Sequence, residues 1–208
     1  MNTQEIQVKH HIRSWPEFYD VARKQFLAYE KLEGIPDWEA HDFSIDCADD
    51  QARFKDMLEI RFVEELTEAS ACLDEGIEHF LEEITDSINF LLSAYIMAGY
   101  DPLRDLPGIQ DFLSLGSNGV KKPGSIDEMA LPAYNLVHRV GWTCNLLKNR
   151  PWAQSNYLVD LLQFKERMTD LWIYFWTWIG SLGINKIMLF DLFERKVEVN
   201  RFRIKSGY

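Results

Sequence analysis

Apolar residues recur three or four positions apart through most of this chain, which is the spacing of one face of an α-helix. Phe18, Val21 and Phe26 form one such series, and Leu58 and Phe62 belong to another. The alternation of apolar and polar residues that marks a half-buried strand is nearly absent. The pattern therefore predicts an all-α fold.

Glycine and proline divide the helical pattern. They gather at residues 34–37 and again over residues 99–124. Such clusters are typical of loops and linkers. We expect one domain, residues 1–208, in which a linker at about 100–124 separates two halves, 1–100 and 125–208.

The two halves share a pattern. Asp86 is followed by an apolar segment that ends at Gly99, and Asp170 is followed by a similar segment that ends at Gly183. A glycine there is typical of a helix C-cap. Residues 61–73 and 134–147 precede these segments as amphipathic helices. Two related hairpins predict a helical bundle built around a four-helix core, although chance likeness between apolar helices is the alternative.

Composition and net charge limit the classes of protein to which this chain can belong. The chain has 208 residues, of which 47% are hydrophobic and 26% charged, so it is long enough to bury a full core. A net charge of −11 argues against a broad basic surface for nucleic acid. The apolar run 171–182 is shorter than the roughly 20 residues of a membrane span, and the first residues lack a signal-peptide core. We expect a cytoplasmic protein that binds neither nucleic acid nor membrane.

Cysteine spacing agrees with that compartment. The three cysteines are far apart, odd in number and form no CxxC pair. We interpret them as reduced, buried, small apolar residues.

The most informative polar feature is a run of acids. Residues 63–102 contain ten acidic residues and no Lys or Arg. Five of the acids form an ExxE with one extra acid before it and, further on, an ExxD: Glu64, Glu65, Glu68, Glu83 and Asp86. On a helix, the two ends of such a motif lie about 4.5 Å apart along the axis and share a face. If the two helices face each other, Glu65, Glu68, Glu83 and Asp86 supply oxygen ligands for one or two Mg²⁺ ions.

The acids have two other interpretations. Acid-rich helix faces are often solvated surface. A di-iron carboxylate bundle requires a Glu-x-x-His motif, but His79 follows Glu75 by four positions and Glu78 by one. We interpret His79 as a surface residue.

A second polar pattern ends the chain. Lys196, Asn200 and Arg203 follow one another at intervals of four and three, so on a helix they share one face. Such a face suits phosphate oxygens, which Arg can bind with two hydrogen bonds. The alternative is an ordinary basic helix end, favoured by the helix dipole.

Taken together, these motifs resemble the all-α nucleoside triphosphate pyrophosphatases, a superfamily that includes MazG-like enzymes. The likeness is strongest to the branch of dimeric dUTPases and phage dCTP/dUTP pyrophosphatases. That branch carries an ExxE, an ExxD followed by a polar and an aromatic residue, and a terminal KxxxNxxRQxxGY. The corresponding segments here are residues 65–68, 83–90 and 196–208.

The resemblance implies a homodimeric enzyme that uses Mg²⁺ to hydrolyse a deoxynucleoside triphosphate, dUTP or dCTP, between its α and β phosphates. By analogy the four core acids would bind the metal, and Glu65 would orient the attacking water. The implied substrate-binding residues are Lys196, Asn200, Arg203 and Tyr208 on the phosphates, Phe90 stacking on the base, and Asn89.

Three departures leave the base open. Ile204 stands where the family often has Gln, Asn89 stands where many members have His, and Gln25 is not followed by the family's Leu-Asn pair. The alternatives are a MazG-like enzyme for other or modified nucleotides and a non-catalytic helical interaction protein.

Aromatic residues are concentrated at 172–178. They cover all sides of the expected helix. This arrangement indicates a buried helix or a subunit interface more than a platform for a base.

Overall fold

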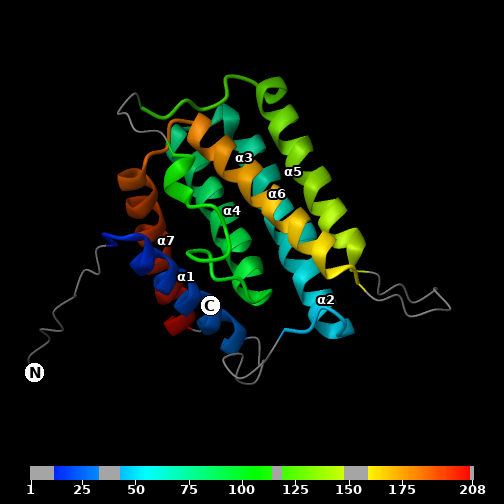
Figure 1. The fold of residues 1–208 in the computed structure, drawn as a ribbon. Helices are drawn as coiled ribbons and strands as arrows, with labels where there is room; N and C mark the ends of the chain where they lie inside the picture. The colour runs from blue at the N-terminus through cyan, green and yellow to red at the C-terminus, as the bar shows by residue number, and fades with distance from the viewer. Residues whose placement is uncertain (1–11, 33–42, 114–118, 148–158, 207–208) are drawn as a thin grey trace, which may run out of the picture.

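The computed structural model describes residues 12–32, 43–113, 119–147 and 159–206, and over these ranges the protein is all-helical, without a strand. Figure 1 shows the helices packed side by side as a bundle. In chain order the α-helices are α1 (Trp15–Leu32), α2 (Ala48–Lys55), α3 (Val63–Ala71), α4 (Ile77–Met97), α5 (Ile126–Leu146), α6 (Leu161–Ser181) and α7 (Lys186–Ser206). The predicted all-α fold is confirmed.

A π-helical segment, η1 (Asp56–Phe62), joins α2 to α3 without a break. Its buried residues include Leu58 and Phe62, two members of the apolar series predicted from the sequence. One short turn of 3₁₀ helix, η2 (Cys72–Asp74), follows α3, and another, η3 (Ile109–Asp111), lies between α4 and α5. Short π segments inside helices often occur at functional sites, so η1 draws attention to the residues beside it.

Two helix pairs make the core. Helix α3 packs along α4, α5 packs along α6, and α3 also contacts α5, which joins the pairs. The aromatic residues of α6 fill the centre: Trp172, Phe175 and Trp176 are fully buried. The indole N–H of Trp172 donates a hydrogen bond to the carbonyl of Pro107 at 2.9 Å. The aromatic series at 172–178 therefore serves the core of this chain and leaves no exposed tryptophan face there for a partner.

Both glycines that end the repeated segments have the conformation predicted for them. Gly99 follows α4 with φ of 77°, and Gly183 follows α6 with φ of 78°. At the end of α4 the N–H of Gly99 bonds to the carbonyl of Ile96 and that of Tyr100 to the carbonyl of Tyr95, which is a Schellman motif. The predicted helix C-caps are confirmed.

Helices α1 and α7 cover α4 on the side away from α5 and α6. Each of the three contacts the other two. Phe18 of α1 packs against Phe190 and Phe193 of α7, with ring centroids 5.6 and 4.6 Å apart. This packing brings the last helix of the chain beside the acid-bearing face of α4.

None of the helices within the described ranges is both long and apolar enough to cross a membrane.

Close packing at α6 predicts a sharp difference between two glycine substitutions. A Cβ atom at Gly180 would lie 1.9 Å from the carbonyl oxygen of Phe112, whereas one at Gly141 of α5 meets no atom within 4 Å. We expect Gly180→Ala to lower the free energy of unfolding by about 1–3 kcal/mol, because the backbone at Phe112 must move. Gly141→Ala should raise it by about 0.5–1 kcal/mol. Urea titrations of both variants measure this, and equal effects would contradict the packing.

Candidate active site

Carboxylates from α3 and α4 meet at one place. One carboxylate oxygen from each of Glu65, Glu83 and Asp86 lies within 4.8 Å of the others. Glu65 lies in the first turn of α3, and the other two lie three residues apart on α4. The predicted facing of the ExxE and ExxD helices is therefore what the packing of α3 on α4 produces.

Burial and mutual repulsion shift the proton equilibria of this group. Burial, and then the charge of Asp86 and a hydrogen bond with Glu83, raise the pKa of Glu65 to about 8. Burial also raises the pKa of Asp86, although Lys196 and Arg203 act in the opposite direction. The carboxylates thus lie where a positive ion would be most strongly bound.

Glu68 lies at the edge of the group. Its side chain is exposed, and it is not one of the three acids whose oxygens come within 4.8 Å of one another. Burial, and then the nearby charge of Glu83, raise the pKa of Glu68, so it lies close to that carboxylate. Glu64, next to Glu65, points outward and is exposed.

A basic residue from near the C-terminal end of the sequence pairs with one of these acids. The ammonium of Lys196 on α7 forms a partly buried ion pair with Asp86. Lys196 therefore supplies one of the cations that residues 63–102 lack. Any divalent ion that binds Asp86 must share that carboxylate with Lys196 or displace the ammonium.

A cavity of about 160 Å³ lies over this group. Its walls come from α1, η1, α3, α4 and α7. The lining residues are Phe26, Tyr29, Glu30, Met57, Arg61, Glu65, Asp86, Asn89, Phe90, Ser93, Lys196, Asn200 and Arg203. Seven of the residues singled out in the sequence thus surround one space, while Glu68 and Glu83 do not line it. Tyr208 lies outside the described residues.

Helix α7 presents its three predicted residues to the cavity. Lys196, Asn200 and Arg203 all line it, as their spacing on one helix face requires. Asn200 is only 3% exposed and lines the cavity, so its amide is a candidate for hydrogen bonding to a ligand there. Arg203 is exposed and lies at the rim.

Asn89 is held by a residue from α1. The Nε2 atom of Gln25 donates a hydrogen bond to Oδ1 of Asn89 at 3.1 Å, and both side chains are buried. In this assignment of the amides, the Nδ2 donors of Asn89 are left for the cavity. The Oε1 atom of Gln25 is buried and has no partner among the described residues.

Some of the cavity wall was not predicted. Six lining residues complete it: Phe26, Tyr29 and Glu30 of α1, Met57 and Arg61 of η1, and Ser93 of α4. Arg61 precedes Glu65 by four residues, so helical spacing alone places it on the same face. The α1 residues carry no comparable signal, because only the packing of α1 on α4 and α7 brings them to the site.

The donor set fits Mg²⁺. Three carboxylates with closely spaced oxygens match the hard oxygen ligands this ion takes, and the ion tolerates incomplete protein coordination because it keeps several waters. Burial, and then the charge of Asp86, raise the pKa of Glu65, so a cation bound beside it would favour the ionised carboxylate.

No family model, curated protein or solved structure matches this chain. The site is therefore interpreted from its own geometry and from the motifs in its sequence.

The carboxylate group predicts stabilisation by Mg²⁺. At a free Mg²⁺ concentration about 100 times the Kd, binding should add about 2.7 kcal/mol, or roughly 5–10 °C in Tm. Glu65→Gln should remove most of this shift because it deletes a ligand charge. Differential scanning fluorimetry with and without Mg²⁺ measures both.

The same experiment has a matched control and a pH dependence. Glu64→Gln changes an exposed neighbour on the same helix and should keep the shift. Because the pKa of Glu65 is raised to about 8 from 4.5, the metal-free protein should lose stability as the pH rises through that range. Equal Mg²⁺ shifts in Glu65→Gln and wild type would contradict the assignment.

Proposed function

We propose that this protein is a Mg²⁺-dependent pyrophosphohydrolase of deoxynucleoside triphosphates, with dUTP as the first candidate and dCTP as the second. The observation that carries the proposal is the cavity whose wall combines carboxylates of α3 and α4 with the Lys196, Asn200 and Arg203 face of α7. The all-α pyrophosphatases that the motifs resemble use this combination of residue types.

Glu65, Glu83 and Asp86 are the proposed metal ligands, with Glu68 close enough to join through solvent. Bound Mg²⁺ would supply the positive charge that the phosphate oxygens need, since the chain itself carries −11. Lys196 and Arg203 add fixed charges on the opposite wall. They stabilise the negative charge that develops on the departing pyrophosphate.

Glu65 is the proposed base. Of the three clustered acids, Glu65 and Asp86 line the cavity, and Asp86 is engaged by Lys196. Glu65 makes no ion pair with Lys196, so besides its proposed place at the metal it would orient a water molecule toward the phosphorus and accept its proton. Water adds to phosphorus, the bond to the bridging oxygen breaks, and the products are the nucleoside monophosphate and pyrophosphate.

The base end of the substrate is assigned to Phe90 and Asn89. Phe90 lines the cavity and can stack on a base, and Asn89 can donate from Nδ2 to a carbonyl of a pyrimidine. A cavity of about 160 Å³ is smaller than the roughly 300–1,000 Å³ that encloses a whole ligand, so a nucleotide would extend past the rim at Arg203.

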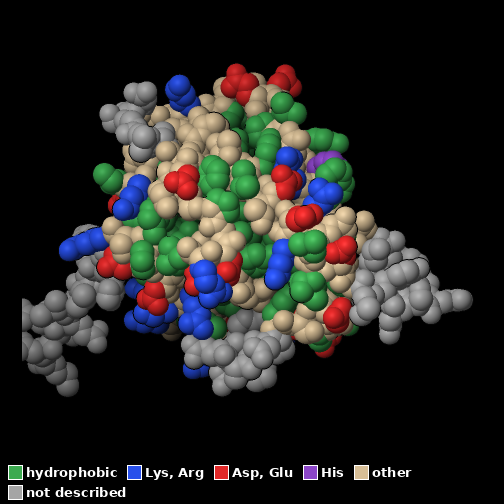
Figure 2. Space-filling model, in the orientation of Figure 1, with side chains coloured by type: hydrophobic (Ala, Val, Ile, Leu, Met, Phe, Trp, Pro, Cys, Tyr) green, Lys and Arg blue, Asp and Glu red, His purple; other side chains and the backbone are tan. Residues whose placement is uncertain are grey.

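A second copy of the chain is the proposed partner. Leu131, Tyr134, Val137 and Trp142 of α5 are exposed, the first two at 67%. Figure 2 shows hydrophobic side chains at the surface along the edge formed by α5. A stripe on a single helix can pair with its own copy about a two-fold axis, because each helix then meets the same residues in reverse order.

Activity is predicted to depend on Glu65 and Asn200 in different ways. With dUTP and Mg²⁺, Glu65→Gln should lower kcat by about 10²–10⁴-fold, since a positioned base contributes that much. Asn200→Ala should instead act mainly through KM, raising it about 10–100-fold because a hydrogen bond to a charged phosphate is lost. Release of pyrophosphate and of the monophosphate, followed by anion-exchange chromatography, measures both.

A panel of nucleoside triphosphates completes this test. Turnover confined to dUTP or dCTP supports the proposal, and broad turnover supports a MazG-like enzyme for other nucleotides. Glu64→Gln should retain wild-type kcat. Folded wild-type protein that releases no pyrophosphate from any nucleotide would leave the non-catalytic interaction protein as the better description.

The dimer is tested separately. Light scattering should give twice the 24.4 kDa of one chain for wild type. Leu131→Glu combined with Val137→Glu should give the monomer mass, because charge at the centre of an apolar interface prevents association. Leu103→Glu changes a residue that is 52% exposed outside α5 and should remain dimeric. A wild-type monomer would refute the dimer.

A further inference from the structure

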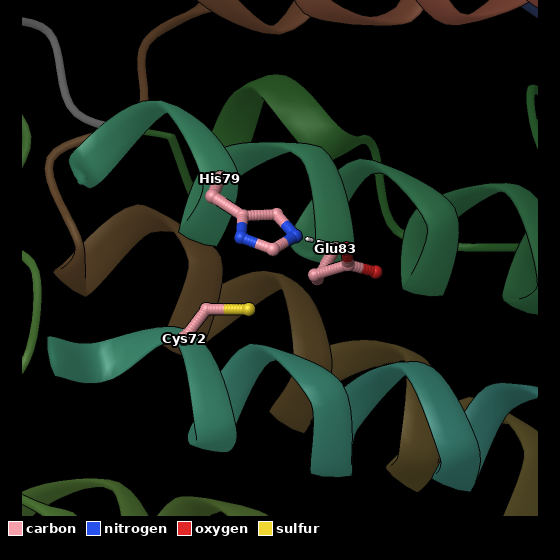
Figure 3. Close-up of side chains that lie close together, drawn as sticks. All are labelled: Cys72, His79 and Glu83. Atoms are coloured by element: carbon pink, nitrogen blue, oxygen red, sulfur yellow. Dashed lines mark ion pairs between the residues drawn. The ribbon is translucent and has the colours of Figure 1, made fainter. Parts of the chain in front are cut away.

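A second group of metal-binding side chains lies beside the carboxylates. Cys72, in the short turn η2, has its sulfur atom close to one nitrogen of His79 and one oxygen of Glu83, and the three atoms lie within 4.8 Å of one another. In Figure 3 the thiol of Cys72 points from the end of the α3 segment toward the imidazole of His79, which comes from the adjoining first turns of α4. Neither residue was given a role by the sequence patterns.

The imidazole is already oriented as in a metal site. Nε2 of His79 lies 3.0 Å from Oε1 of Glu83, one turn further along α4. The other nitrogen, Nδ1, contacts the carboxylate of Glu75. Metal-binding histidines usually donate their second N–H to a carboxylate, which selects the tautomer and fixes the ring plane. Glu75 occupies that position here.

The turn that carries the thiol is fixed in place. The ammonium of Lys122 donates hydrogen bonds to the carbonyls of Leu73 and Glu75, at 2.5 and 2.9 Å. These bonds hold the backbone between Cys72 and His79. Cys72 itself is buried, and burial, followed by the charges of nearby glutamates of which Glu75 contributes most, raises the pKa of its thiol. A divalent cation would find a small, negatively charged and already ordered group of ligands.

We propose that Cys72, His79 and Glu83 bind Zn²⁺, with Glu75 as the outer carboxylate that positions His79. Sulfur, nitrogen and oxygen together are the donor set of Zn²⁺, whereas Mg²⁺ takes oxygen ligands. Around a tetrahedral Zn²⁺ with bonds of about 2.0–2.3 Å, ligand atoms lie about 3.3–3.8 Å apart. The nitrogen of His79 and the oxygen of Glu83 are already 3.0 Å apart, and the sulfur of Cys72 lies within 4.8 Å of the ligand atoms of both residues. Binding displaces the thiol proton of Cys72 to solvent.

Glu83 belongs to both groups of ligands. A carboxylate oxygen of Glu83 lies within 4.8 Å of oxygens of Glu65 and Asp86, and one likewise lies within 4.8 Å of the ligand atoms of Cys72 and His79. A Zn²⁺ ion at Cys72 therefore competes for, or bridges through, a ligand of the proposed Mg²⁺ site. The Zn²⁺ site itself rests on geometry alone and does not depend on the proposed hydrolytic function.

Co²⁺ titration of the reduced, metal-free full chain tests this site. A cobalt–thiolate bond gives a near-ultraviolet charge-transfer band, which should appear with one equivalent of Co²⁺ and disappear when Zn²⁺ is added. Cys72→Ser should abolish the band. Cys144→Ser, which changes a buried cysteine on α5 outside the cluster, should keep it. Glu75→Gln should weaken Co²⁺ binding by about 10–100-fold while keeping the band.

A variant of the partly exposed ligand His79 tests whether loss of the band could come from misfolding. His79→Gln alters a side chain that is 43% exposed, so it should stay folded by circular dichroism and still lose the band at stoichiometric Co²⁺. A band of wild-type intensity in folded Cys72→Ser or His79→Gln, or no thiolate band in wild type, would overturn the proposal. Loss of nucleotide hydrolysis has no bearing on this result, because the readout is the metal–sulfur bond.

Discussion

Repulsion between carboxylates at the contact of α3 and α4 is the constraint on which the rest of the site depends. Packing α3 on α4 buries the core residues Leu66 and Ile84, and it also brings Glu65, Glu83 and Asp86 within 4.8 Å of one another. The apolar contact is favourable and the charge contact is not. Carboxyl groups with shifted pKa values are concentrated at functional sites, and burial followed by the charge of Asp86 raises the pKa of Glu65 to about 8.

The rest of the fold offsets part of that charge. Helix α7 places Lys196 on Asp86, and the aromatic contacts of Phe18 with Phe190 and Phe193 hold α7 and α1 together beside α4. Hydrophobic packing of Phe190 and Phe193, one to two helical turns before Lys196, thus fixes the position of the Lys196 ammonium. The same packing creates the cavity, because α1 and α7 lean over the acids without filling the space between them.

The two proposed groups of metal ligands differ in chemistry although they share Glu83. The carboxylates facing the cavity suit a hard cation that keeps its waters, and the thiol and imidazole on the other side suit Zn²⁺. An ion bound at one group would weaken the binding of an ion at the other, because the shared carboxylate cannot give its full charge to two ions. Residues 65–86 thus carry the proposed ligands of two ions of different chemistry within one helical hairpin.

Local patterns in the sequence determined the helices, the glycine caps at Gly99 and Gly183, and the shared faces of the ExxE, ExxD and C-terminal motifs, because helical geometry relates residues only three or four positions apart. Only the tertiary structure decided which faces meet. Lys196 reaches Asp86 across 110 residues of sequence, and the walls that α1 and η1 contribute have no local signature. His79 and Glu83 are four residues apart on α4, which is a local relation, but only the turn between α3 and α4 places the thiol of Cys72 beside them. These contacts come from the packing of whole helices, where apolar burial sets the position and the polar side chains follow it.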